Sequence, residues 1–102
     1  MKEYRIVYKQ KAKEDVESLF YFIVSQYKTY RTAEKYVDGI EETILTLKRS
    51  PESFQIQSHK SISQYGVNAR RINYKRMAII YTVHESVVYI HRIVASSLIS
   101  DL

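Results

Sequence analysis

The sequence predicts an α+β fold, a two-layer sandwich in which a helical hairpin packs on a small antiparallel sheet. Three observations predict it: one short alternating stretch at the start, two long stretches with helical periodicity after it, and three strand-like runs at the end. The order is therefore β-α-α-β-β-β, with both helices on one face of the sheet. The 102 residues suit one hydrophobic core, so we predict a single domain over residues 1–102.

The first half is predicted to hold one strand and two amphipathic helices. "YRIVY" alternates and is rich in β-branched and aromatic residues, which predicts a strand over residues 4–9. Apolar residues at helical spacing predict a helix over residues 11–28. Its apolar stripe consists of Ala12, Val16, Leu19, Phe20, Ile23 and Tyr27. The second helix is expected to begin after an N-cap at Thr32 and to end near Arg49, ahead of Pro51, which makes an antiparallel hairpin.

The second half is predicted to be a polar loop over residues 51–67 followed by three strands, over 69–74, 76–84 and 86–94. The gaps between these strands are short enough to allow only antiparallel hairpins. Alternate side chains of a strand point to opposite faces of the sheet. The set expected to face the helices consists of Ile72, Tyr74, Ala78, Ile80, Val88 and Ile90. The other set is expected to form an amphipathic outer face with Arg71, Asn73, Tyr81, Tyr89 and His91.

The composition argues against several classes of site. Two Gly and no Cys leave little basis for a glycine-rich phosphate loop, a disulfide or a thiolate metal site. His59, His84 and His91 have no metal-ligand spacing, so we predict no metal and no cofactor. No apolar run reaches the ~18 residues of a membrane span, and the N-terminus lacks the apolar region of a signal peptide. We therefore expect a cytoplasmic protein that does not bind membranes.

Positive charge is concentrated in the second half of the chain. The net charge is +5, and residues 1–52 contain ten basic and nine acidic residues, whereas residues 53–102 contain six and two. This imbalance predicts an anionic partner, either nucleic acid or an acidic protein segment. The residues expected to bind it are Arg70, Arg71, Tyr74, Lys75, Arg76, Tyr81, Tyr89 and Arg92.

These side chains also allow two other interpretations. In a metal-free nuclease, cations would stabilise the phosphate and a Tyr or His would move protons. The residues for such a site are Arg71, Arg76, Arg92 and His91, with Tyr89 as a second proton carrier. Alternatively, the charges only protect the sheet from aggregation, and Arg92 pairs with a helix carboxylate such as Asp15 or Glu14.

The strings "AKEDVESLFYFI", "TAEKYVDGIEETILTLKRSP" and "ARRINYKRMAIIYTVHESVVYIHRI", in this order, resemble the RelE/ParE family of toxins from bacterial type II toxin-antitoxin modules. The resemblance covers about residues 3–94. It implies a basic toxin of a plasmid-stabilisation type of module that arrests growth. It also implies a cognate antitoxin, whose C-terminal segment wraps over the helices and the sheet.

The resemblance implies two possible targets. RelE-like members cleave messenger RNA in the ribosomal A site with cations and a Tyr or His in the tail, whereas ParE-like members inhibit DNA gyrase and are not enzymes. Arg71 and Arg92 match family arginines, but the tail "IVASSLISDL" contains neither Tyr nor His, and its Ser96 and Ser97 lack an evident base.

The tail and the two long helices of nearly equal length favour a ParE-like gyrase inhibitor. The tail also lacks the His-Gln common in ParE. The alternative is a ribosome-dependent mRNA endonuclease, and a third hypothesis is a family member that has lost toxicity and only binds its antitoxin.

Overall fold

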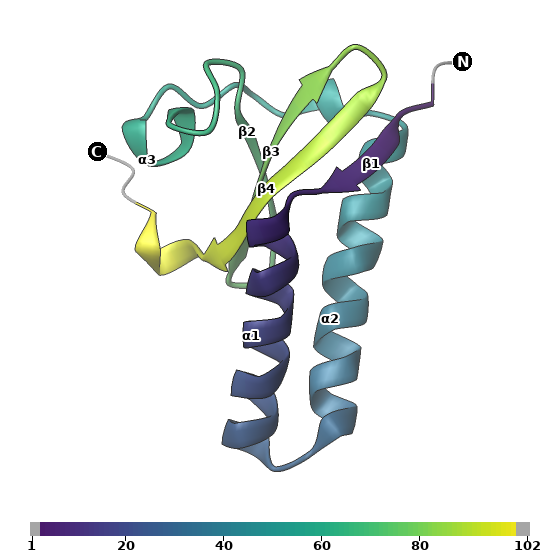
Figure 1. Ribbon diagram of the computed structural model, residues 1–102, viewed down its shortest axis with the longest axis vertical. Coiled ribbons are helices and arrows are strands. Elements are labelled where there is room, and N and C mark those ends of the chain that lie inside the picture. The colour runs from purple at the N-terminus through teal and green to yellow at the C-terminus, as the bar shows by residue number, and fades with distance from the viewer. Residues whose placement is uncertain (1–2, 100–102) are drawn as a thin grey trace.

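Two helices follow the first strand, and three further strands complete the sheet in the predicted order (Figure 1). The computed structural model describes residues 3–99. Its elements are β1 (Arg5–Tyr8), α1 (Gln10–Tyr27), α2 (Tyr30–Leu45), α3 (Lys60–Ser63), β2 (Arg70–Tyr74), β3 (Met77–His84) and β4 (Val87–Ala95). Three short 3-10 helices lie at Thr46–Lys48, Pro51–Ser53 and Ser96–Leu98. The predicted α+β class is confirmed, and α3 is a single turn within the predicted loop.

The sheet has the strand order β1-β4-β3-β2. β2 with β3, and β3 with β4, form the two antiparallel hairpins that the sequence predicted, with left-handed residues at their turns, Lys75 (φ 51°) and Glu85 (φ 56°). β1, however, pairs with β4 in parallel, so the sheet is mixed and not purely antiparallel. Alternation is the same in parallel and antiparallel strands, and a helical hairpin is long enough to return the chain in either direction.

The helical hairpin turns three residues earlier than predicted. The N-cap of α2 is Thr29 and not Thr32: the Thr29 hydroxyl accepts a hydrogen bond from the Arg31 amide at 3.2 Å. α1 ends because Lys28 is left-handed (φ 59°) and its amide donates to the Val24 carbonyl at 2.8 Å. The connection between the helices is therefore short, and they lie antiparallel as predicted (Figure 1).

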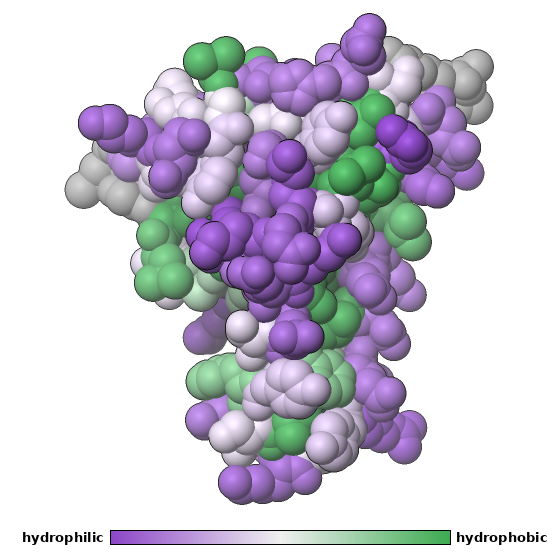
Figure 2. Space-filling view, viewed as in Figure 1, coloured by the Kyte–Doolittle hydropathy of each residue, from purple (hydrophilic) through white to green (hydrophobic). Residues whose placement is uncertain are grey.

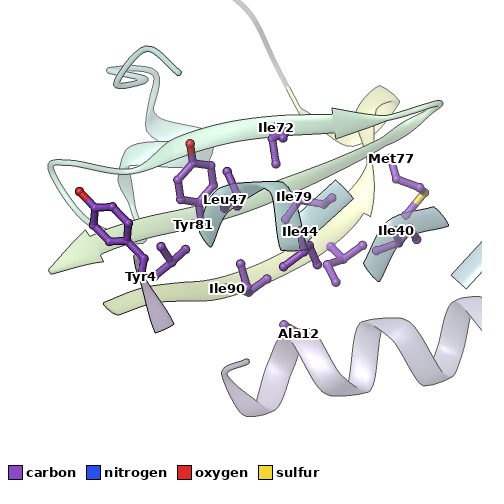
Figure 3. Packing of buried hydrophobic residues seen from close by; sticks show 12 residues of the cluster. Tyr4, Ala12, Ile40, Ile44, Leu47, Ile72, Met77, Ile79, Tyr81 and Ile90 are labelled. Atoms are coloured by element: carbon purple, nitrogen blue, oxygen red, sulfur yellow. The ribbon is translucent and has the colours of Figure 1, made fainter. Parts of the chain in front are cut away.

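The main core lies between the sheet and the two helices (Figure 3). Ile40 and Ile44 of α2 pack with Ile79 and Ile90 of the central strands, and all four are fully buried. Tyr81 is also fully buried here, and its hydroxyl donates a hydrogen bond to the Pro51 carbonyl at 2.6 Å. Removing this apolar surface from water is the main contribution to the stability of the fold.

A second, smaller core covers the opposite face of the sheet. Ile62 of α3 packs there with Ala78, Ile80 and Ile99. Ala78 and Ile80 were predicted to meet the long helices and Tyr81 to face outward; both assignments were wrong. Residues 77–82 are buried on both faces, so polar alternation, the signal that assigns a strand's faces, is absent from β3.

A β-bulge in β4 changes which of its side chains face the helices. Ile80 pairs with Arg92 but Tyr81 pairs with Ile90, which leaves His91 as an extra residue on β4. Val88 and Ile90 lie in the main core as predicted, because they precede the bulge. Arg92 lies beyond the bulge, so its side chain does not point to the same face of the sheet as those of Val88 and Ile90.

The helical hairpin extends well beyond the sheet (Figure 1). Aromatic side chains near the α1–α2 turn are largely exposed: Tyr21 by 61%, Phe22 by 59%, Tyr27 by 65% and Tyr30 by 63%. Figure 2 shows apolar and weakly polar side chains gathered at this end of the molecule, whereas hydrophilic side chains cover the start of α1. The apolar stripe predicted for α1 therefore extends past the part of the helix that the core buries.

Candidate functional site

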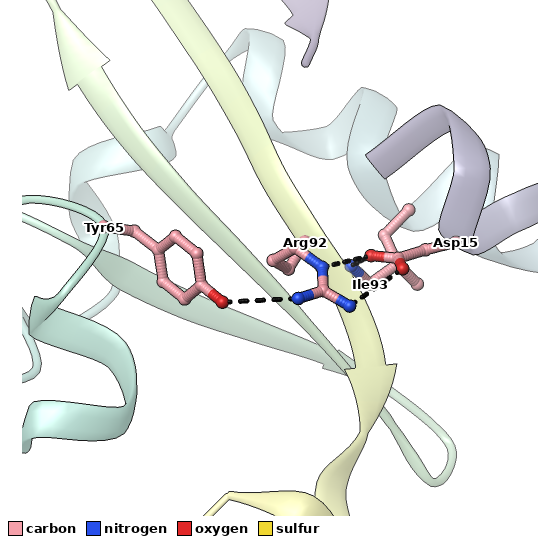
Figure 4. A network of polar contacts seen from close by, with 4 residues as sticks. All are labelled: Asp15, Tyr65, Arg92 and Ile93. Atoms are coloured by element: carbon pink, nitrogen blue, oxygen red, sulfur yellow. Dashed lines mark hydrogen bonds and ion pairs between the residues drawn. The ribbon is translucent and has the colours of Figure 1, made fainter. Parts of the chain in front are cut away.

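Arg92 is held by a carboxylate of α1 (Figure 4). Its Nε and Nη2 donate to the two Asp15 oxygens at 2.7 and 3.0 Å, and its Nη1 donates to the Tyr65 hydroxyl at 3.4 Å. The hydrogen bonds with Asp15 are the main reason that the pKa of Arg92 is raised above its ordinary value. Among the sequence interpretations, pairing of Arg92 with Asp15 is the one that the structure bears out.

Asp15 also caps the free edge of β4. Hydrogen bonding between β1 and β4 ends where the Lys9 amide donates to the Ile90 carbonyl at 2.9 Å. Beyond that point the Ile93 amide donates to Asp15 at 2.8 Å (Figure 4). One carboxylate therefore satisfies a backbone donor and a guanidinium together, which fixes α1 against the sheet.

Arg70 is held by backbone carbonyls. Its Nη1 donates to the Glu52 carbonyl at 3.1 Å and to the Phe54 carbonyl. The same loop is bound by Tyr81 through Pro51 and by Tyr4, whose hydroxyl donates to the Glu52 carboxylate at 2.8 Å. Arg70 therefore anchors the loop between α2 and β2 against the edge strand.

Arg71 lies on the outer face, in one row with Arg92. Ile80 pairs with Arg71 on one side and with Arg92 on the other, so the two arginines are two strand spacings apart, about 10 Å. The Arg71 Nε donates to the Asn73 side chain at 2.9 Å. The Arg92 guanidinium, by contrast, points to Asp15 and Tyr65.

Tyr74, Lys75 and Arg76 form the β2–β3 turn beside the helical hairpin. Tyr74 meets Tyr36 of α2 edge to face at 5.2 Å between ring centroids, and the Lys75 ammonium lies 5.5 and 5.6 Å from these two rings. Gly39 makes this packing possible, since a Cβ there would lie 2.1 Å from the Tyr74 hydroxyl oxygen. Lys75 and Arg76 are exposed.

Tyr89 and His91 lie on the outer side of β4. The Lys9 ammonium is 5.6 Å from the Tyr89 ring centroid, and the Thr82 hydroxyl lies 2.8 Å from Nε2 of His91. Burial, followed by the charges of Lys9 and His84, lowers the pKa of His91 below its ordinary value. The environment of His91 therefore favours the neutral imidazole.

The residues predicted to bind one partner thus occupy several separate places. Arg70 and Arg92 are bound within the protein, and Tyr81 is in the core, where it cannot contact a partner. Among these predicted residues, Lys75 and Arg76 of the β2–β3 turn are exposed, and the Lys75 ammonium lies next to two aromatic rings.

Sequence reasoning missed a groove beside this turn. It has a volume of about 560 Å³ and is lined by Leu19, Phe22 and Tyr27 of α1, Tyr36 of α2 and Arg76, among others. A smaller hollow of about 410 Å³ adjoins it on the other side of Tyr36 and is lined in part by Lys35 and Lys75. The apolar stripe of α1 gave no signal of the groove, because helical spacing is the same where the sheet covers the helix and where it does not.

The part of the chain that the structure describes contains neither a candidate metal site nor a helix that could span a membrane. Within residues 3–99, no three His, Cys, Asp or Glu side chains are grouped so that they could hold a metal ion. None of the helices there combines the length and apolar character needed to cross a membrane.

Comparison with known proteins identifies the family. The family model of the ParE toxin of type II toxin-antitoxin systems, parDE, matches residues 4–97. A solved structure of the chromosomal ParDE TA system from P. aeruginosa shares the fold: the TM-score is 0.76 at 16% identity, over 91% of this chain and 96% of that chain. No curated protein sequence matches significantly. The RelE/ParE resemblance is thus confirmed on the ParE side, and the chain belongs to the ParE toxin family of type II toxin-antitoxin systems.

Proposed function

We propose that this chain arrests bacterial growth by inhibiting DNA gyrase in the cytoplasm, and that a cognate antitoxin neutralises it by binding. Membership of the ParE family over residues 4–97 is the observation that carries the proposal. Inhibition by binding requires a stable surface and no reacting groups, so the protein acts as a ligand of its target and not as an enzyme.

The surroundings of Arg92 support this proposal against the mRNA endonuclease alternative. A nuclease needs cations that are free to stabilise the charge that develops on a phosphate. The Arg92 guanidinium is already hydrogen-bonded by Asp15 and Tyr65. Releasing it would leave the Asp15 carboxylate, which is only 15% exposed, without its cationic partner.

The state of His91, the first candidate for a proton carrier, also argues against acid catalysis by this side chain. His91 has a lowered pKa and is within hydrogen-bonding distance of Thr82, so as the neutral imidazole it is a poor general acid. The 3-10 helix after β4, Ser96–Leu98, contains no group that titrates near neutral pH.

A supercoiling assay with purified gyrase and relaxed plasmid tests the proposed target. Addition of the purified chain at a stoichiometric ratio should stop supercoiling, and prior addition of the antitoxin encoded beside the gene should restore it. Uninhibited supercoiling at large molar excess would exclude gyrase as the target.

RNA mapping in arrested cells separates the two targets. If the chain inhibits gyrase, messages should remain intact when growth stops, in the wild type and in Arg71→Ala alike. Codon-phased cleavage that Arg71→Ala abolishes would instead support the endonuclease. Normal growth on expression of the folded chain without antitoxin would support a family member that only binds its antitoxin.

A further inference from the structure

We propose that the chain forms an antiparallel, twofold-symmetric dimer with a second copy of itself through three aromatic side chains at the end of the helical hairpin. These side chains, Phe20, Tyr21 and Tyr30, form the tip cluster. A twofold axis through the cluster brings the cations of one hairpin turn opposite carboxylates of the other copy. Neither gyrase inhibition nor neutralisation by an antitoxin includes self-association, so this inference goes beyond the proposed function.

The tip cluster joins the two helices at a place on the hairpin separate from the groove. The Phe20 ring meets the Tyr21 ring edge to face at 5.6 Å and the Tyr30 ring at 6.1 Å between centroids. Tyr21 and Tyr30 are nevertheless 61% and 63% exposed, and none of the three side chains lines the groove. Rings that already pack against one another lose little conformational freedom on association, and exposed aromatic rings often anchor protein interfaces.

Charges of opposite sign lie on the two sides of the tip cluster along the hairpin. Lys28 and Arg31 lie in and beside the turn between α1 and α2, at the end of the hairpin. Glu17 and Glu34 each lie four residues, about one helical turn, nearer the sheet than the tyrosine of the same helix. All four side chains are exposed, and within residues 3–99 none of them forms an ion pair.

A second copy turned by 180° presents this pattern in the reverse order. The cations of each hairpin turn then lie opposite the carboxylates of the other copy, and the twofold axis repeats the arrangement on both sides of the cluster. The rings of the two clusters meet at the axis, where their exposed surface is removed from water. A parallel arrangement would place like charges opposite each other, so the charges also select the antiparallel one.

The same pattern argues against nucleic acid as the occupant of the tip cluster. Aromatic rings beside cations would suit stacked bases. Glu17 and Glu34, however, lie one turn from the two tyrosines and would repel the phosphates of a bound strand. An acidic protein segment meets the same repulsion. The cluster therefore fits a partner of mixed charge, and a second copy has the complementary order in its own sequence.

Sedimentation equilibrium of the whole chain at about 5–200 μM tests the dimer. The contact is small, so we expect a dissociation constant in the micromolar range. Tyr21→Ala and Tyr30→Ala should each weaken the dimer about tenfold. Phe22→Ala is the matched control: Phe22 is 59% exposed on the same helix but lines the groove, so its loss should change the dissociation constant by less than about twofold. Urea unfolding confirms that each variant is folded.

Two charge-reversed variants test the arrangement itself. One combines Glu17→Lys with Glu34→Lys, and the other combines Lys28→Glu with Arg31→Glu. Each variant alone brings like charges together across the axis and should sediment as a monomer over the same range. An equimolar mixture restores opposite charges at both contacts, so it should associate about as strongly as the wild type.

Three results would overturn the proposal. They are a wild-type chain that stays monomeric over the whole range, equal losses for Tyr21→Ala and Phe22→Ala, and a mixture of the two charge-reversed variants that does not associate. A single-stranded oligonucleotide that binds the wild type but not Tyr21→Ala would also contradict it, because the tip cluster would then belong to a nucleic-acid site.

Discussion

The arginines of the sheet and the cations of the β2–β3 turn come from neighbouring parts of the sequence but have opposite surroundings. Arg70 donates to two carbonyls and Arg92 to a carboxylate, whereas Lys75 and Arg76 are exposed beside aromatic rings. The difference teaches that a cation is available to a partner only where the fold brings no acceptor of its own within reach. Neighbouring positions in the sequence do not determine this.

The largest effect is expected from Asp15→Ala. The substitution leaves the Arg92 guanidinium and the Ile93 amide without their acceptor, and should lower the free energy of unfolding by about 2–3 kcal/mol. Urea unfolding measures it. Glu14→Ala, at the exposed neighbour whose carboxylate accepts a 3.3 Å hydrogen bond from Gln10, should change stability by less than about 0.5 kcal/mol. Equal effects of the two would show that Arg92 is not structurally bound.

A direct comparison of two arginines should give the next largest effect. Arg70→Met removes the donor to the Glu52 and Phe54 carbonyls and should destabilise the protein by about 1–2 kcal/mol. Arg76→Met, at an exposed position in the β2–β3 turn, should stay within about 0.5 kcal/mol of the wild type in the same unfolding experiment. A larger loss from Arg76→Met would contradict the division between bound and available cations.

Gly39→Ala should destabilise the protein by about 1 kcal/mol, although Ala favours helices. The added Cβ would meet the Tyr74 ring, which must move away from Tyr36 and from the Lys75 ammonium. Thermal unfolding measures the loss, and Gly39→Ala combined with Tyr74→Ala should cost less than the sum of the two single changes. Additive losses would mean that Tyr74 does not depend on Gly39.

The smallest effect concerns pH. Since the pKa of His91 is lowered from 6.5 in the folded protein, the unfolded chain takes up this proton first as the pH falls. Stability should therefore be independent of this group well above pH 6.5 and should decrease as the pH falls through 6.5. His91→Gln, which keeps a hydrogen-bonding partner for Thr82, should reduce this decrease in urea unfolding. An identical pH dependence of the two proteins would contradict it.

From the sequence, the elements and their order could be predicted more fully than the faces of the sheet on which the side chains lie. Helical spacing from Ala12 to Tyr27 and the three final runs placed every long element, because the two periodicities differ. The faces of β3 were assigned wrongly, since Ala78, Ile80 and Tyr81 are all buried. A strand covered on both sides carries no alternation to interpret.

The candidate site was predictable only in part. The excess of cations after residue 52 indicated an anionic partner, and the pairing of Arg92 with Asp15 was among the expected alternatives. The role of Phe22 and Tyr27 was missed, because a helical stripe reads the same whether or not a sheet covers it. Their exposure follows from where the sheet ends.

By itself the sequence determined the α+β class, the element order and the family likeness, since these follow from local periodicity and from the order of motifs along the chain. The tertiary structure alone decided the parallel pairing of β1, the bulge at His91, and which cations are bound internally. The physical reason is that strand direction, register and ion pairing depend on contacts between residues far apart in the chain, such as Asp15 with Arg92.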